Sequence, residues 1–144
     1  MLLGRYRLNL DRKHQLVLPE AFRQQFADGA YITRGFEQNL LIVSEKEFQV
    51  IYQRVAGLNL ADPLARLLHR LILGNAIKLE ISASGRVCLP QELVAFAGLE
   101  KDIILVGQGD YCEAWAPADW VKQSSVLLDT VANSARFAQL NLAF

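Results

Sequence analysis

Hydrophobic and polar positions alternate in an order that the chain follows twice. In the first half they predict a half-buried strand over 5–10, a polar turn over 11–14, a strand over 16–18, a helix over 20–26 and strands over 31–33 and 40–43. Pro19 marks the start of the first helix, because proline suits a first helical position. Ser44 and Glu47 form a capping-box pattern, which predicts that another helix follows the fourth strand.

The second half repeats this order of elements. It predicts strands over 76–81 and 87–89, a turn over 82–85, a helix from Pro90 to Gly98, strands over 103–106 and 111–115 and a helix from Pro117. The turn, strand and proline of segment 11–19 recur in segment 82–90, which is 71 residues further along. Gly35 and Gly107, each between two predicted strands, are 72 residues apart. This internal repeat predicts an α+β fold with a mainly β core, made of two tandem β-β-α-β-β-α repeats.

Four parts are expected along the chain: a first repeat over residues 5–49, a connecting helix over 58–75, a second repeat over 76–122 and a C-terminal helical tail over 123–144. Asp62 and Pro63 suit the N-cap and first turn of the connecting helix. Its broad apolar face predicts a packed connector, since a flexible linker would be rich in Gly and Ser. The apolar end of the tail, from Leu140 to Phe144, is expected to dock on the body of the protein or on a neighbour.

Composition narrows the class of protein. The chain is 52% hydrophobic, and a domain of 144 residues buries only part of its surface when it folds alone. We therefore expect a second copy to cover some apolar surface, with a tightly packed monomer as the alternative. No apolar run reaches the ~18 residues of a membrane span, and the first residues lack a secretory pattern, so we expect a cytoplasmic protein. Cys88 and Cys112 fall in predicted strands and are interpreted as reduced core cysteines.

Charge is unevenly distributed along a chain whose net charge is zero. Residues 1–72 hold ten basic and seven acidic residues, whereas residues 73–144 hold five and eight. Four basic residues and one acid fall within the first fifteen positions: Arg5, Arg7, Arg12, Lys13 and Asp11. Such a basic stripe is weak evidence for a polyanionic partner, and on charge alone ordinary surface charge is the simpler interpretation.

Several short motifs, in a fixed order, resemble one family. They are Leu3-Gly4-x-Tyr6, the Asp11…Pro19 turn and strand, Thr33-Arg34-Gly35, Arg66…Gly74-Asn75-Ala76, Gly85-Arg86-Val87-x-Leu89-Pro90 and Ala97-Gly98-Leu99-Glu100-Lys101. Over residues 1 to about 122 the chain is similar to MraZ, a bacterial family built from two copies of the AbrB/SpoVT swapped-hairpin unit. The resemblance implies a pseudo-twofold swapped-hairpin barrel with flanking helices that assembles into rings. It also implies sequence-specific binding to short direct repeats upstream of the division and cell-wall gene cluster, usually as a repressor.

The strand over 5–10 and the return strand over 16–18 are predicted to form an N-terminal hairpin with a basic turn. Two antiparallel strands of this kind can approach a groove of double-stranded DNA edge-on. Arg and Lys neutralise phosphates, while a few side chains that reach base edges supply sequence selectivity. Arg86, or the side-chain amide of Gln15, could form two hydrogen bonds with one base. The predicted DNA-binding residues are Arg5, Arg7, Arg12, Lys13, Gln15 and Arg86. We expect a homo-oligomer associated with the nucleoid, because repeated turns could read repeated sites.

Each turn departs from the family pattern, in which an arginine follows an acidic residue by four positions and comes directly after a glycine. The first turn keeps Asp11 but has His14 and Gln15 where glycine and arginine are usual. The second turn keeps glycine and Arg86 but has Ser82 at the acidic position. A positive φ is costly for a residue with a Cβ, so His14 restricts its turn. We interpret His14 as a solvated turn residue, with a pH switch or a phosphate contact as alternatives.

The half-kept turns leave a second hypothesis open, an oligomeric scaffold of the same fold whose DNA contacts have weakened or been lost. An enzyme is not expected, because the sequence holds no typical catalytic set. His14 and His69 have no partners that can be assigned to a Ser/His/Asp set, and no Walker-type phosphate loop is present. Two separated histidines and two cysteines give no metal-ligand spacing. We therefore expect no metal, no cofactor, no small-molecule substrate and no membrane partner.

Overall fold

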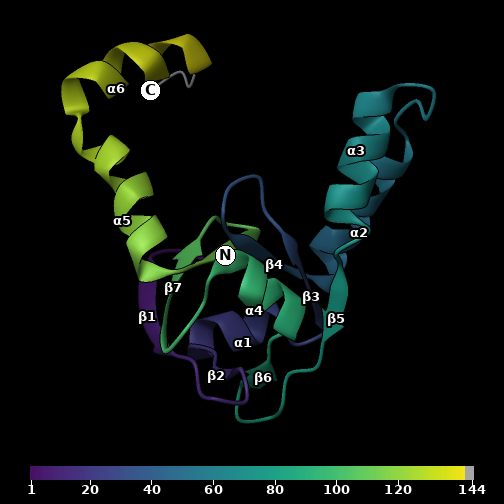
Figure 1. Cartoon of the computed structure of the whole chain (residues 1–144), viewed down its shortest axis with the longest axis vertical. Helices are drawn as coiled ribbons and strands as arrows, with labels where there is room; N and C mark the ends of the chain where they lie inside the picture. The colour runs from purple at the N-terminus through teal and green to yellow at the C-terminus, as the bar shows by residue number, and fades with distance from the viewer. Residues whose placement is uncertain (142–144) are drawn as a thin grey trace.

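The computed structural model describes residues 1–141, which form eight strands and six α-helices (Figure 1). The strands are β1 (Arg5–Asn9), β2 (Gln15–Val17), β3 (Ala30–Arg34), β4 (Leu40–Ser44), β5 (Ile77–Leu79), β6 (Arg86–Cys88), β7 (Asp102–Gly107) and β8 (Tyr111–Trp115). The helices are α1 (Glu20–Gln25), α2 (Glu45–Ala56), α3 (Pro63–Ile72), α4 (Gln91–Ala97), α5 (Pro117–Ser125) and α6 (Thr130–Phe137), with 3-10 turns η1 (Val126–Leu128) and η2 (Ala138–Leu140). The predicted order of elements is confirmed.

The two repeats share one six-stranded sheet of order β1-β7-β8-β4-β3-β5, which is internally symmetric. β1 of the first repeat pairs antiparallel with β7 of the second, and β5 of the second pairs antiparallel with β3 of the first. β4 and β8, the last strands of the two repeats, pair at the centre. The order therefore reads as the same series of equivalent strands from either edge, which agrees with the predicted pseudo-twofold arrangement. Its closure into a barrel stays a prediction.

The expectation that β1 and β2 pair as one local hairpin is wrong. β1 pairs with β7, and β2 pairs with β6 in a separate two-stranded sheet. The register of this small sheet places Leu16 opposite Val87. The turn after β1 still reverses the chain, but each strand finds its ladder partner in the other repeat. Local sequence patterns set the length of a strand and its buried face, whereas the pairing partner depends on distant residues.

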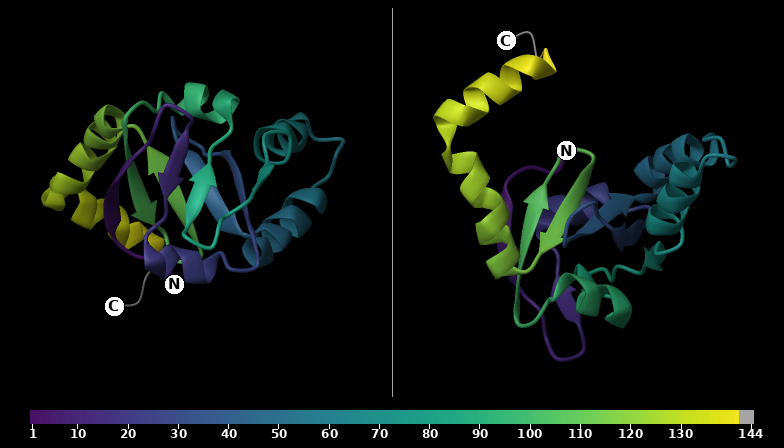
Figure 2. Two further views of the ribbon diagram at one scale, coloured as in Figure 1. Left: turned by 90° about the horizontal axis from the view of Figure 1, so that it is seen from below. Right: turned by 45° about the horizontal axis from the view of Figure 1, so that its top comes forward.

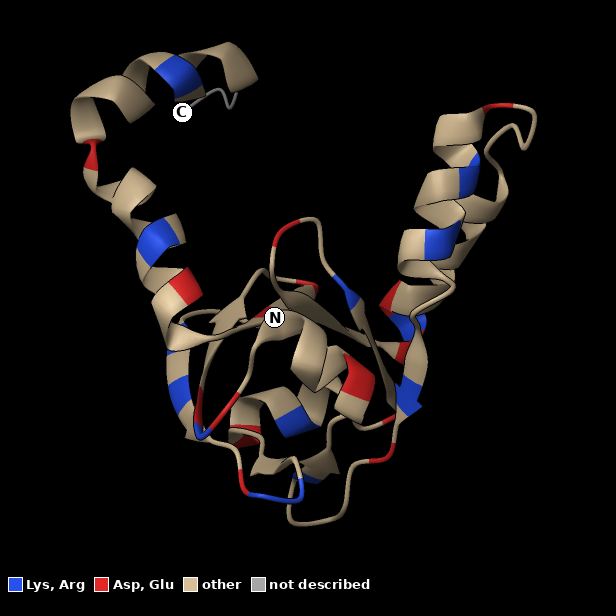
Figure 3. Cartoon of the chain, viewed as in Figure 1, with Lys and Arg blue, Asp and Glu red and all other residues tan. Residues whose placement is uncertain are grey.

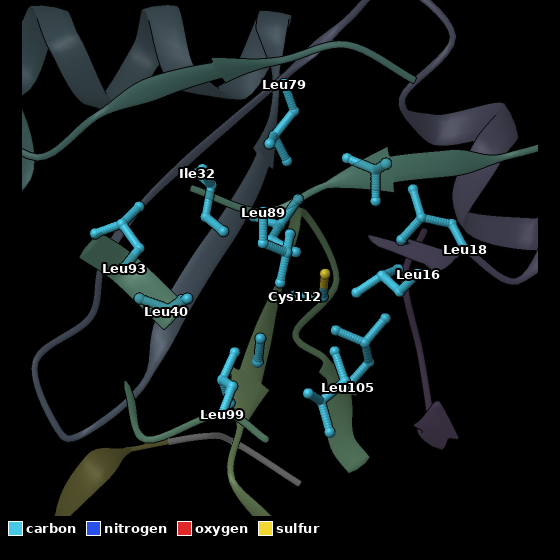
Figure 4. Close-up of a cluster of buried hydrophobic side chains, with 14 of the residues drawn as sticks. Leu16, Leu18, Ile32, Leu40, Leu79, Leu89, Leu93, Leu99, Leu105 and Cys112 are labelled. Atoms are coloured by element: carbon cyan, nitrogen blue, oxygen red, sulfur yellow. The ribbon is translucent and has the colours of Figure 1, made fainter. Parts of the chain in front are cut away.

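One continuous hydrophobic core fills the space between the two sheets, with α1 and α4 contributing to it (Figure 4). Leu16 and Leu18 reach it from the first repeat, and Leu89 reaches it from the second. Cys112 is fully buried in this core, as predicted, but the prediction for Cys88 is wrong because its side chain is exposed. Alternation along β6 explains the difference, since Val87 points inward and its two neighbours therefore point outward.

Local capping signals in the sequence are confirmed. The hydroxyl of Ser44 accepts a hydrogen bond from the backbone N–H of Glu47 at 3.3 Å, at the start of α2. The carboxylate of Asp62 accepts one from the N–H of Leu64 at 2.9 Å, at the start of α3. These side chains satisfy N–H groups that have no partner within the helix.

Two helical arms leave the sheet on the same side, opposite the end that carries β2 and β6 (Figures 1 and 2). The α2–α3 arm is a pair of helices that pack on each other and on β3. The α5–α6 arm is extended, which confirms helix in the early part of the tail. Leu140 is exposed in the single chain, and residues 142–144 lie outside the described residues, so the docking of the tail stays a prediction. Within residues 1–141, every helix is too short or too polar to cross a membrane.

Candidate nucleic-acid interface

Two turns of the same construction meet at the end of the molecule opposite the arms (Figure 1). We call residues 11–14 the first turn and residues 82–85 the second turn. The N–H of Asp11 donates to the carbonyl of Gln15, and the N–H of Ser82 donates to the carbonyl of Arg86, each at 3.0 Å. The first residue of each turn also accepts the N–H four positions later through its side chain, at 2.9 Å for Asp11 and 3.0 Å for Ser82. The carboxylate of Asp11 and the hydroxyl of Ser82 therefore cap their turns in the same way, by accepting a backbone N–H.

Both turns end on a residue with a left-handed backbone. His14 has φ of 60° and Gly85 has φ of 83°, so the predicted demand for a positive φ at this position is confirmed. The carbonyls of these two residues accept hydrogen bonds across the repeats, from Leu89 at 2.8 Å and from Leu18 at 2.9 Å. The small β2–β6 sheet thereby joins the two turns, which holds them side by side on a buried base.

The acid of one turn and the arginine of the other lie together. The guanidinium of Arg86 lies 4.0 Å from the carboxylate of Asp11 and 3.4 Å from the side-chain carbonyl of Gln15. In the sequence, the first turn keeps only the acid of the family's acid–arginine pair and the second turn keeps only the arginine. Pairing of β2 with β6 brings this acid and this arginine into one cluster. These contacts bring together Arg86 and Gln15, the two side chains that could contact bases.

The carboxylate of Asp11 is stabilised in its charged form. The hydrogen bond from the backbone N–H of Gln15, and then those of Lys13 and the nearby positive charge of Arg86, hold the pKa of Asp11 below its ordinary value of 3.8. Because its pKa is lowered, this exposed carboxylate stays charged at neutral pH and offsets part of the local positive charge.

The two turns differ in charge although their backbones match. Arg12 and Lys13 project from the first turn and are exposed, whereas the second turn has Ala83 and Ser84 at the equivalent places. Figure 3 shows this contrast as a blue loop above a tan one at the lower end of the molecule. Positive charge is therefore concentrated on one of the two turns.

Two of the predicted residues lie apart from this cluster. Arg5 and Arg7 are exposed on β1, which runs along the side of the molecule as an edge strand (Figure 1). Arg7 forms an ion pair of 3.1 Å with Asp102 on β7, so its charge is already compensated. The structure thus brings Arg12, Lys13, Gln15 and Arg86 together and leaves Arg5 and Arg7 on the adjoining flank.

Sequence patterns missed two basic residues near the turns. Arg23, on α1, donates from Nε to the carbonyl of Leu18 at 2.8 Å, and a Cβ on Gly85 would overlap with its side chain. Lys101 lies beside the first turn, where its carbonyl accepts the N–H of Leu10 at 2.7 Å and its side chain helps to line a shallow groove. Neither residue belongs to a turn, so only the folded chain brings them close.

This cluster is suited to binding an anion rather than to chemistry. Among residues 1–141, no three His, Cys, Asp or Glu side chains are grouped so that they could hold a metal ion. His14 is partly buried in the first turn, next to exposed Arg12 and Lys13. Exposed guanidinium and ammonium groups on the projecting turns can neutralise phosphates, and Arg86 and Gln15 offer donors for base edges.

Comparison with known proteins identifies relatives over nearly the whole chain. The family model described as "MraZ protein, putative antitoxin-like" matches twice, over residues 1–71 and 72–141. A protein from Thermomicrobium roseum named "Transcriptional regulator MraZ" is 36% identical over 127 residues, covering 88% of this chain and 89% of its own. One of the same name from Herpetosiphon aurantiacus is 33% identical and covers 94% and 92%. Another from Clostridium acetobutylicum is 28% identical and covers 99% and 100%.

Proposed function

The chain belongs to the MraZ family, and from this premise we propose that it is a DNA-binding transcriptional regulator that reads short direct repeats with its paired turns. Its relatives are named as regulators, so the chain is a member of a regulatory family and not of an enzyme family. The exposed Arg12, Lys13 and Arg86 on the rigid β2–β6 sheet support this proposal most directly.

The side chains of the turns and the adjacent strands have two roles in this proposal. Arg12 and Lys13 neutralise phosphates, which supplies affinity that falls steeply with salt. Arg86 and Gln15 face base edges from the adjacent strands and supply sequence preference, because a guanidinium pairs with guanine and an amide with adenine. Arg5 adds positive charge on the flank of the sheet, and Arg7 contacts DNA there by exchanging its ion pair with Asp102 for a phosphate. Arg23 acts as a positioning residue through its bond to the carbonyl of Leu18.

Assembly into a homo-oligomeric ring completes the proposal. A single pair of turns covers few base pairs, so selectivity for direct repeats requires several copies at fixed spacing. Exposed apolar side chains on both arms support association, among them Leu64, Leu67, Leu128 and Val131. We propose that such a ring represses a division and cell-wall gene cluster from the nucleoid, within the cytoplasm.

Fluorescence anisotropy with labelled duplexes tests the DNA-binding proposal. The protein should bind the region upstream of its own gene more tightly than a shuffled duplex of equal length at the same salt concentration. Equal affinity for the two duplexes would contradict a sequence-specific regulator. Deletion of the gene should raise expression of a reporter driven by that region, and a fall in expression would contradict repression.

Two variants test the assigned residues. Arg86→Ala and Lys13→Ala should each weaken binding without lowering the melting temperature, because both side chains are exposed. Arg54→Ala is a matched control, since Arg54 is an exposed arginine on α2, away from the turns. A loss of binding in the control as large as in the turn variants would mean that general charge, and not these turns, binds DNA.

A scaffold that acts through protein partners is the second candidate. It is favoured by the uncharged second turn, where Ala83 and Ser84 replace the basic pair of the first turn. Under this hypothesis the protein assembles fully but shows the same weak affinity for all duplexes.

A further inference from the structure

Two hollows of about 200 Å³ each lie at equivalent places in the two repeats. We call the one beside α2 the first hollow and the one beside α5 the second hollow. Five lining residues of the first, Phe36, Leu41, Phe48, Ile51 and Val55, recur 72 positions later in the second as Gln108, Glu113, Trp120, Gln123 and Leu127. The hollows are therefore internal-repeat counterparts, and the way one is closed indicates how the other can be closed.

The first hollow is closed by a helix of the same chain. Leu68 and Ile72 of α3 line it, and the hydroxyl of Thr33 donates to the carbonyl of Ile72 at 2.6 Å. This buried hydrogen bond fixes the end of α3 against the sheet. Thr33 pairs with Leu41 in β4, and Val106 pairs with Glu113 at the equivalent place in β8, so Val106 is the counterpart of Thr33. Val106 has no hydroxyl to hold a second helix.

No α6 residue lines the second hollow, because the connection from α5 to α6 is mostly helical and does not reverse the chain. Residues 57–62 form the loop between α2 and α3, whereas η1 and Asp129 alone separate α5 from α6. The buried side chain of Asn133 donates to the carbonyl of Val126 at 2.6 Å and fixes the elbow between these helices. α6 therefore leads away from β7 and β8, whereas its counterpart in the first repeat, α3, packs against β3 (Figures 1 and 2).

The second hollow combines aromatic and acidic groups. Trp115 and Trp120 lie with ring centroids 5.8 Å apart. The carboxylate of Glu113 accepts hydrogen bonds from the Trp115 ring at 2.7 Å and from the Asn39 amide at 2.6 Å, and Glu37 adds an exposed acid. Burial raises the pKa of Glu113, so an incoming cation would relieve an unfavourable charge. A fitting occupant is an apolar helix face with a basic residue beside it.

α3 presents such a face to solvent. Its inward side lines the first hollow with Leu68 and Ile72. On its outer side, Leu64 and Leu67 are 70% and 60% exposed although they are large apolar residues. Arg70 follows Leu67 by three positions, so it lies next to it on the helix surface and is also exposed. α6 offers Arg136 as its one basic residue, and that side chain is bonded to Asn133 at 3.2 Å.

We propose that α3 of a second copy of this chain packs its Leu64–Leu67 face into the second hollow, with its Arg70 next to the carboxylates of Glu37 and Glu113. This inference rests on the proposed homo-oligomer and specifies its contact surface. The contact joins α3, in the half of the chain with excess positive charge, to a hollow lined mainly by the half with excess negative charge, residues 73–144. Glu37 is the one acid that the first half contributes to this hollow. It is head-to-tail, so each copy uses both of its arms and successive copies can close into a ring.

Charge exchange tests this contact in the full-length protein. Arg70→Glu and Glu37→Lys should each lower the oligomer mass measured by light scattering, and a chain that carries both changes should regain it. Arg54→Glu is the matched control and should keep the wild-type mass. All three positions are exposed, so melting temperatures should stay unchanged. If Arg70→Glu leaves the mass unchanged, or if the double variant fails to regain it, the proposed contact is wrong.

Cysteine cross-linking tests the direction of the contact. In a Cys88→Ser background, chains carrying Leu67→Cys and chains carrying Gln123→Cys should form disulfide-linked pairs only when they are mixed. Ala83→Cys mixed with Gln123→Cys should form none, because Ala83 belongs to the second turn, next to β6, at the end of the molecule opposite the arms (Figure 1). Cross-linking of Leu67→Cys with itself would replace the proposal with a symmetric α3–α3 contact.

These results separate failure of the contact from failure of the proposed function. A wild-type protein that binds its direct repeats and assembles, but whose assembly resists Arg70→Glu, contradicts the contact alone. A wild-type protein that assembles through this contact but shows no duplex preference contradicts the regulator alone. A monomeric wild-type protein contradicts the contact and the proposed ring together.

Discussion

Gly85→Ala should destabilise the protein because Gly85 meets two separate requirements. Its φ of 83° is unfavourable for any residue with a Cβ. An added Cβ would also overlap with the side chain of Arg23, which must then leave the carbonyl of Leu18. Gly98 is a matched control, since its φ is 63° and a Cβ there meets no atom within 4 Å.

The expected magnitude follows from these contacts. A left-handed residue with a Cβ costs about 1–2 kcal/mol, and loss of glycine freedom in the unfolded chain offsets about 0.4–1 kcal/mol of it. Gly98→Ala should therefore lower the free energy of unfolding by about 1 kcal/mol. Gly85→Ala adds the loss of the Arg23–Leu18 hydrogen bond, about 1 kcal/mol, for a total of about 2 kcal/mol.

Urea unfolding of a double-mutant cycle separates the two causes. In an Arg23→Ala background the obstruction is absent, so Gly85→Ala should cost about 1 kcal/mol, like Gly98→Ala. The coupling free energy between the two sites should then be about 1 kcal/mol. If the two substitutions are additive, or if Gly85→Ala costs no more than Gly98→Ala in the wild-type protein, Arg23 does not restrict the second turn.

Three further predictions concern the first turn. In DNA titrations, Lys13→Ala should reduce the slope of log affinity against log salt concentration by about 1. Lys46→Ala on α2 is the control and should keep the wild-type slope. Equal slopes for the wild-type protein and both variants would contradict a phosphate contact at Lys13. His14→Gly should raise the free energy of unfolding in urea by about 0.5 kcal/mol, because relief of the positive φ exceeds the added freedom of the unfolded chain; a decrease would mean that the imidazole makes stabilising contacts. The lowered pKa of Asp11 stabilises the fold at pH values above the unfolded value of 3.8, and this contribution is lost as pH falls through the folded-state pKa. Asp11→Asn should therefore flatten the decline of melting temperature below pH 3.8. An unchanged decline in the variant would contradict this role of the carboxylate.

Much of the fold could be predicted because its signals are local. The caps at Ser44 and Asp62 act within three residues of themselves, and a repeat offset of 71 to 72 residues is visible without knowing any contact. Strand partners could not be predicted in this way, because β1 and β2 each pair with a strand of the other repeat. Exposure of Cys88 follows from which face of β6 is buried, and the sequence alone does not identify that face.

The sequence predicts which residues belong to the two turns but not how these residues are arranged in space. The turn position that needs a positive φ was identified from the glycine and histidine at its two occurrences. The contact between Asp11 and Arg86 was missed, because it exists only after β2 and β6 have paired. Arg23 could not be predicted for a similar reason. It lies on α1 in the first repeat, and only folding brings its side chain next to Gly85 in the second turn.

The matched backbones of the two turns have a consequence for how recognition can diversify. A protein assembled as a dimer of single repeats would carry the same side chains on both turns, so any gain or loss of charge would occur twice. Here both turns belong to one polypeptide, and the hydrogen-bond frame tolerates Asp11 in one turn and Ser82 in the other. Each turn can therefore change its chemistry while the shared frame is preserved. One chain can carry a positively charged turn and a nearly neutral turn, and mutation can adjust the two independently.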